Sequence, residues 1–152
     1  MPLRAVVNQH PLFEGLENHY LYGLHGCAAD ATFAGGATVF EYGEPANYFY
    51  LIGEGRISLD IAVPGRGIIP VQTLLSGDVV GWSWLYPPYQ WHFSGRALEE
   101  TTAIAFDADC VRQLIAQDHE FGFEMMKRFS KIVIERLQAA RIQLIDMYAV
   151  AS

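Results

Sequence analysis

The middle of the chain alternates short apolar runs with glycine-rich turns, which is the pattern of β-strands. Five runs are rich in β-branched and aromatic residues, and one of them alternates polar and apolar side chains: 38–42, 48–52, 56–61, 68–75 and 101–106. Glycine, proline and short polar residues fill the turns between them. Strands that recur about every 8–12 residues predict an antiparallel β jelly roll, or β-roll, over residues 31–107.

Helical periodicity flanks this β-roll on both sides. In an N-terminal helical segment, residues 1–30, apolar side chains recur at helical intervals, which predicts one or two short helices: Leu12, Phe13, Leu16, Tyr20 and Leu24. A C-terminal segment, residues 108–152, begins with a short helix that Asp107 or Asp109 would cap. A long helix then runs from about residue 118 to residue 148. The predicted fold class is therefore mainly β with helices.

The long helix carries two apolar edges. One edge steps by four, three, four and three residues, as in a heptad seam: Val133, Leu137, Ala140, Leu144 and Met147. The other edge consists of Ile132, Ile134, Ile142 and Ile145. We expect the second edge to pack on the body and the seam to form a homodimer interface, although both edges could also belong to the core.

Composition and charge exclude several classes of function. The 152 residues carry a formal net charge of -7, which argues against nucleic acid and against a polybasic membrane contact. The N-terminal apolar run is too short for a signal peptide, and no run of about 18 apolar residues occurs. The two cysteines, Cys27 and Cys110, match no metal or redox motif. A cytoplasmic protein with two reduced, buried thiols is the expectation.

The order of these elements resembles the cyclic nucleotide-binding domain of the catabolite activator (Crp/Fnr) family. The similarity extends from about residue 10 to residue 147 and rests on five short motifs: Pro11-Leu12-Phe13, Gly43-Glu44-Pro45-Ala46, Tyr50-Leu51-Ile52, Gly77-Asp78-Val79-Val80-Gly81 and Arg96-Ala97-Leu98-Glu99. The resemblance implies a regulatory domain whose ligand lies in a phosphate-binding cassette, here residues 77–97. The family's transcription factors continue into a helix-turn-helix, whereas this sequence stops at Ser152. No direct DNA binding is therefore expected.

The cassette departs from the family pattern at its two ligand anchors. The resemblance places a glutamate after Gly81 for the ribose, but Trp82 stands there. It places an arginine for the phosphate at Trp91 or at His92, depending on a one-residue gap. A charge-assisted hydrogen bond contributes about 1.5–3 kcal/mol. The loss of the glutamate and arginine anchors therefore disfavours tight nucleotide binding. No cofactor is expected, although a cyclic nucleotide stays possible.

The candidate ligand pocket therefore consists of cassette residues of mixed chemistry: Gly81, Trp82, Ser83, Trp84, Leu85, Trp91, His92 and Arg96. The aromatic rings of this stretch either form a pocket for a flat or apolar ligand or collapse and fill the nucleotide's place. Arg96 is expected to form an ion pair with Glu99 or Glu100.

No catalytic motif is visible. Ser83 has no evident base, and the five histidines form no metal-ligand motif, so no metal site is expected. We expect a non-enzymatic ligand-sensing or protein-interaction domain with a degenerate cassette. The alternatives are a cyclic nucleotide-responsive domain with a rearranged cassette, using the backbone at residues 81–85 and Arg96, and a small jelly-roll metalloenzyme using His92.

Overall fold

The computed structural model describes residues 3–151, and the side chains of residues 5–149. The helices in chain order are α1 (Leu3–Gln9), η1 (Pro11–Phe13), α2 (Asn18–His25), η2 (Ser83–Leu85), α3 (Ala108–Gln117) and α4 (His119–Ala151). The strands are β1 (Ala28–Phe33), β2 (Thr38–Phe40), β3 (Tyr48–Glu54), β4 (Ile57–Val63), β5 (Gly67–Leu74), β6 (Val79–Val80), β7 (Ser94–Ala97) and β8 (Thr101–Asp107). The predicted fold class, mainly β with flanking helices, is confirmed.

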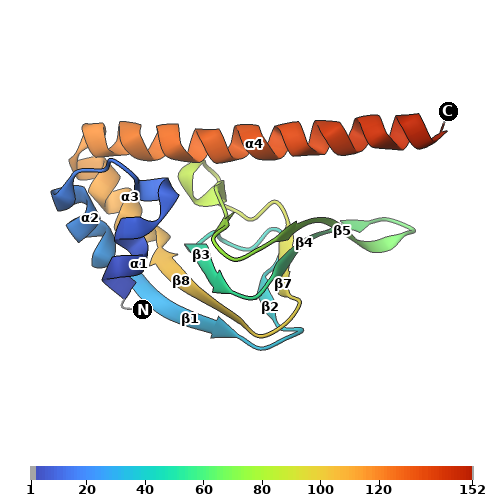
Figure 1. The fold of residues 1–152 in the computed structure, drawn as a ribbon, viewed down its shortest axis with the longest axis horizontal. Coiled ribbons are helices and arrows are strands. Elements are labelled where there is room, and N and C mark those ends of the chain that lie inside the picture. Colours follow the sequence, from blue (N-terminus) through green and yellow to red (C-terminus); the bar gives the residue numbers. More distant parts are fainter. Residues whose placement is uncertain (1–2, 152) are drawn as a thin grey trace.

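Two four-stranded antiparallel sheets form the β-roll. Their strand orders are β1-β8-β3-β6 and β2-β7-β4-β5. The first strand begins at Ala28, three residues before the start that the sequence predicts for the roll. Figure 1 shows α4 lying across the roll, with α1, α2 and α3 gathered at the end where α4 begins and the β4–β5 hairpin reaching toward its other end.

An aromatic core joins the helices to the roll. Phe49 of β3 stacks on Phe106 of β8 with ring centroids 4.6 Å apart, and on Trp84 of η2 at 4.7 Å. Phe129 of α4 meets both Phe49 and Trp84 edge to face. Because Trp84, Phe49, Phe106 and Phe129 are all fully buried, η2 and α4 are fixed against the same sheet.

Aspartates cap the two C-terminal helices. The backbone N–H of Cys110 donates to Asp107 at 3.0 Å, so Asp107 is the N-cap of α3. The N–H groups of Glu120 and Phe121 donate to Asp118 Oδ1 at 3.0 and 3.2 Å at the start of α4. These hydrogen bonds, with desolvation opposing them, lower the pKa of the Asp118 carboxyl.

The second apolar edge of α4 does not pack on the body as predicted. Only Ile132 is half-buried, while Ile134, Ile142 and Ile145 are 54%, 60% and 64% exposed. The body instead contacts the first half of α4 through Phe121, Met125 and Phe129. Beyond Ile132, the apolar side chains of this edge are therefore mostly exposed among the described residues.

The two cysteines form a disulfide, which corrects the expectation of reduced thiols. Cys27 lies just before β1 and Cys110 lies in the first turn of α3, and their Cα atoms are 5.6 Å apart. The prediction failed because 83 residues separate the two positions. Only the pairing of β1 with β8, which leads into α3, brings them together.

Candidate functional site

The cassette loop that follows β6 begins at a glycine whose place the fold dictates. Gly81 has φ +104, and a Cβ atom there would lie 2.7 Å from the Trp91 ring. A side chain at this position would therefore be both strained and in steric conflict. The chain then forms η2 and a loop, and it returns to the sheet as β7.

Trp91 lies inside the roll rather than beside it. Its ring stacks on Phe40 of β2 with centroids 3.6 Å apart and an interplanar angle of 9°, and it is 6% exposed. The space around this pair, the roll pocket, measures about 10 Å³ and is lined by Phe40, Leu59, Gly81, Trp82, Ser83, Trp91, Phe93 and Arg136. A void this small holds at most one water molecule.

Trp82 is held between the roll and α4. It meets Phe93 edge to face at 5.8 Å, and the Arg136 guanidinium of α4 lies 5.2 Å from the centre of its ring. Arg136 also donates a hydrogen bond to the carbonyl of Val79 in β6. Burial lowers the pKa of Arg136 to about 10, and its Nη1 has no hydrogen-bond partner among the described residues. Arg136 therefore fastens α4 to the cassette.

Ser83 has a histidine partner that the sequence did not reveal. Its buried Oγ lies 2.9 Å from Nδ1 of the exposed His92, at hydrogen-bond distance. No base for Ser83 was evident in the sequence, because His92 comes close to it only through the fold of the loop. Within the described part of the chain, however, no carboxylate contacts His92 to orient its ring, so the pair lacks the third member of a hydrolytic triad.

Arg96 pairs with a different acid from the one predicted. Its Nε donates to Asp60 Oδ2 at 3.4 Å, while Glu99 pairs with Arg56. Asp60 is almost fully buried and also accepts a hydrogen bond from Ser58 at 2.5 Å. The prediction failed because β4 and β7 pair with Ser58 opposite Arg96, which directs the guanidinium across the sheet rather than along its own strand.

The predicted pocket residues therefore fall into three groups. Gly81, Trp82, Ser83 and Trp91 line the roll pocket. His92 lies on the outer side of the loop. Trp84, Leu85 and Arg96 line neither the roll pocket nor the two larger cavities beside α4. The sequence reasoning missed Phe40, Leu59 and Arg136. Of these, only Arg136 could have been identified from the sequence, because it is a basic residue on the body-facing side of an amphipathic helix.

Two larger cavities border α4. The junction cavity, about 740 Å³, lies where η1, the β5–β6 turn and α4 meet. Its seven charged side chains are Glu14, Asp78, Lys127, Arg128, Lys131, Glu135 and Arg136. The cassette cavity, about 490 Å³, lies between residues 82–92 and α4, and no Lys, Arg, Asp or Glu lines it.

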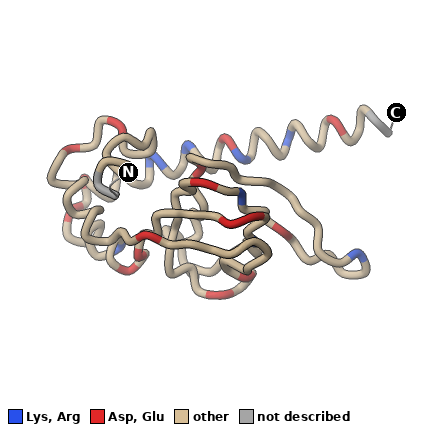
Figure 2. The backbone as a smooth tube through the Cα atoms, turned by 60° about the horizontal axis from the view of Figure 1, so that its bottom comes forward, with Lys and Arg blue, Asp and Glu red and all other residues tan. Residues whose placement is uncertain are grey.

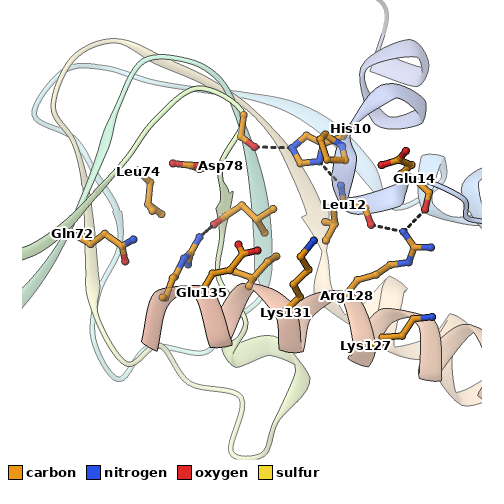
Figure 3. A pocket seen from close by; sticks show the side chains of 15 residues that line it. His10, Leu12, Glu14, Gln72, Leu74, Asp78, Lys127, Arg128, Lys131 and Glu135 are labelled. Atoms are coloured by element: carbon orange, nitrogen blue, oxygen red, sulfur yellow. Dashed lines mark hydrogen bonds between the residues drawn. The ribbon is translucent and has the colours of Figure 1, made fainter. Parts of the chain in front are cut away.

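Hydrogen bonds tie together the walls of the junction cavity, as Figure 3 shows. His10 accepts from the Leu12 N–H through Nδ1, and its Nε2 donates to the Gly77 carbonyl at 2.7 Å. Arg128 donates to the carbonyls of Leu12 and Glu14, both at 2.8 Å. Four basic residues of α4 line this cavity, namely Lys127, Arg128, Lys131 and Arg136, and Figure 2 shows the basic residues spaced along the helix.

Within residues 3–151, no group of three or more His, Cys, Asp or Glu side chains lies close enough to hold a metal ion. None of the described helices is both long and apolar enough to cross a membrane.

Comparison with solved structures places this geometry in a known fold. A cyclic nucleotide-binding domain from Methylobacillus flagellatus superimposes with a TM-score of 0.79 at 19% identity, covering 94% of this chain and 80% of that one. The catabolite activator protein of Thermus thermophilus gives a TM-score of 0.71 at 20% identity, covering 91% and 63%.

Sequence comparison agrees with the structural one. A CRP-like cAMP-activated global transcriptional regulator of Mycobacterium tuberculosis is 24% identical over 136 residues, which is 90% of this chain and 59% of the regulator. The chain thus spans about three-fifths of the length of that relative. The family model of the cyclic nucleotide-binding domain matches residues 31–118, more than half of the sequence. The chain therefore belongs to the cyclic nucleotide-binding domain family.

Proposed function

We propose that this chain is a non-enzymatic regulatory domain whose roll pocket is closed to cyclic nucleotides. The observation that carries the proposal is the position of Trp91. Its ring stacks on Phe40 and covers Gly81, so that about 10 Å³ is left where the cassette meets the roll. A ligand could enter only if Trp91 left the core, which would expose a buried indole.

The charges of the cassette support the same conclusion. A cyclic nucleotide presents one phosphate anion, for which bidentate arginine is the usual partner. Arg96, the cassette's single arginine, already pairs with the buried Asp60, and Trp82 stands where the glutamate of the family would lie. Turning Arg96 toward a phosphate would leave Asp60 buried without its counter-charge, which is costly.

The exposed half of α4 supports dimerisation. Leu137, Leu144 and Met147 of the heptad seam are 50%, 53% and 68% exposed, and Ala140 is exposed beside them. Apolar seams of this spacing are stabilised by packing against a second helix. We infer that a second copy of the chain covers the seam and that the domain acts as a homodimer.

Calorimetric titration with cyclic AMP and with cyclic GMP tests the closed pocket. We expect no saturable heat up to roughly 1 mM of either nucleotide, which corresponds to less than about 4 kcal/mol of binding free energy. Micromolar binding that Arg96→Gln abolishes would instead support the second candidate, a cyclic nucleotide-responsive domain. That candidate draws on the name of the M. tuberculosis relative, which is cAMP-activated.

A further inference from the structure

The cassette cavity lies on the outer side of the loop that closes the roll pocket. Its cassette wall includes Trp82, Ser83, Tyr86 and His92, and its α4 wall is Ser130, Val133 and Ile134. Its volume of about 490 Å³ falls within the range of roughly 300–1,000 Å³ that is typical of small-molecule sites. The roll pocket, by contrast, has room for no ligand.

The walls of the cassette cavity favour an uncharged occupant. None of its lining residues is a Lys, Arg, Asp or Glu, whereas the junction cavity carries seven such side chains. An ionised ligand placed between apolar walls would lose its hydration and gain no counter-charge. Flat apolar rings would gain the most binding free energy here. Trp82 and Tyr86 offer them aromatic surface, and the α4 side chains Val133 and Ile134 offer aliphatic surface.

The aromatic wall is fixed before any ligand arrives. Trp82 is held on one side by Phe93, which meets it edge to face, and Arg136 holds it from α4. A side chain that is already immobilised loses little conformational entropy on binding. The wall therefore suits recognition of a rigid molecule.

One pair of polar side chains, Ser83 and His92, can orient a ligand in the cassette cavity. Ser83 is 4% exposed, and its Oγ shares a hydrogen bond with His92 Nδ1 at 2.9 Å. A hydroxyl can donate one hydrogen bond and accept two, so Ser83 can also contact an occupant. The cavity thus combines mostly apolar walls with a small number of placed polar atoms, as small-molecule sites do.

We propose that the cassette cavity binds an uncharged, flat and largely apolar small molecule. A hydrogen bond between Ser83 and one polar atom of this ligand would orient it. This deepens the proposed function, since it gives the regulatory domain a ligand site outside its closed roll pocket. The occupant would contact Val133, the first residue of the heptad seam, and so the helix that we infer to dimerise.

Titration with the neutral fluorescent probe 1-aminoanthracene tests the site. We expect one saturable site per chain. Ser130→Trp, which fills the cavity from α4, should weaken binding at least tenfold. Lys131→Trp is the matched control, since the neighbouring residue lines the junction cavity and its replacement should change affinity less than twofold. If Ser130→Trp fails to fold, Tyr86→Ala, at an exposed position, replaces it and should weaken binding at least threefold.

A charged analogue separates the two cavities. Anthracene-2-carboxylate should bind at least tenfold more weakly than the neutral probe. If the carboxylate binds as tightly and Lys131→Met weakens it, the junction cavity is the site and the proposal is overturned. No saturable binding of the neutral probe also overturns it, as does binding that Ser130→Trp leaves unchanged. The nucleotide titration and sedimentation test the proposed function in separate measurements, so a failure of this site can be told apart from a failure of the proposed function.

Discussion

Trp91 lies flat on Phe40, with the two ring planes 9° apart and their centroids 3.6 Å from each other. The contact joins the end of the cassette loop to β2 in the second sheet. Gly81, at the start of the cassette loop after β6, lies against the far edge of the same indole. One side chain therefore fixes both ends of the loop to the roll, and the contact that we propose closes the roll pocket is also a core contact.

Trp91→Ala should destabilise the fold strongly. Truncating a buried tryptophan removes its apolar contacts and leaves a cavity, which typically costs about 3–5 kcal/mol. Equilibrium unfolding in urea measures this loss, and we expect the midpoint to fall with little change in slope. Gln90→Ala is the control, because this exposed neighbour should alter stability by less than about 0.5 kcal/mol. A Trp91→Ala loss below about 1 kcal/mol would mean that the indole is not a packed core residue.

The fold was predictable because its signals are local. Alternation over residues 56–61 and the turn at residues 64–67 both appear in the structure, as β4 and the β4–β5 hairpin. The changed anchor position at Trp82 was equally visible, since it follows Gly81 directly. Such features depend on neighbours in the sequence, and period and turn chemistry reveal them.

The contacts that the sequence did not predict depend instead on how strands distant in the sequence pair with each other. Arg96 reaches Asp60 because β7 pairs with β4 in one register, with Ser94 opposite Asp60. A shift of one residue would have turned Arg96 to the other face of the sheet. The Ser83–His92 pair likewise requires the loop between η2 and β7 to fold back on itself. No local pattern encodes these contacts, so the sequence offered Glu99 and Glu100 as equally good partners for Arg96.

The heptad seam predicts a change in oligomeric state when charge enters it. Leu137→Glu together with Leu144→Glu would place like charges opposite each other in a paired helix and remove apolar packing. We expect the wild type to sediment as a dimer and the double variant as a monomer with unchanged helix content. Gln138→Glu with Gln143→Glu adds the same charge at exposed α4 positions outside the seam and should stay dimeric. A wild type that sediments as a monomer at all concentrations would contradict the inferred dimer.

The Cys27–Cys110 disulfide predicts a redox-dependent stability. The bridge closes a loop over a sequence separation of 83 residues, and removing it frees the unfolded chain. For loops of this length, chain entropy accounts for roughly 4–5 kcal/mol. Unfolding in guanidinium chloride should therefore show the wild type losing most of this amount when dithiothreitol is added. The Cys27→Ala/Cys110→Ala variant should show the same lower stability with and without the reductant. Equal stability of reduced and oxidised wild type would count against the bridge.

The cap of α4 predicts a pH dependence that Asp118 controls. Its carboxylate accepts the N–H groups of Phe121 and Glu120, and the Tyr20 hydroxyl also donates to it, so that its folded-state pKa is lowered. The unfolded chain has a carboxyl pKa of about 3.9. The charged cap therefore stabilises the fold above that pH, and its contribution is lost as the pH falls through the lower folded-state value.

Asp118→Asn isolates this contribution, because asparagine keeps the capping oxygen but cannot carry the charge. We expect the wild type to be the more stable protein at about pH 6, and the difference in the free energy of unfolding to shrink toward zero as the pH falls below the lowered folded-state pKa of Asp118. Glu120→Gln, whose exposed side chain caps nothing, should show no comparable change over the same range. A difference between wild type and Asp118→Asn that stays constant from pH 6 to the acid limit would show that the carboxylate charge contributes nothing to the cap.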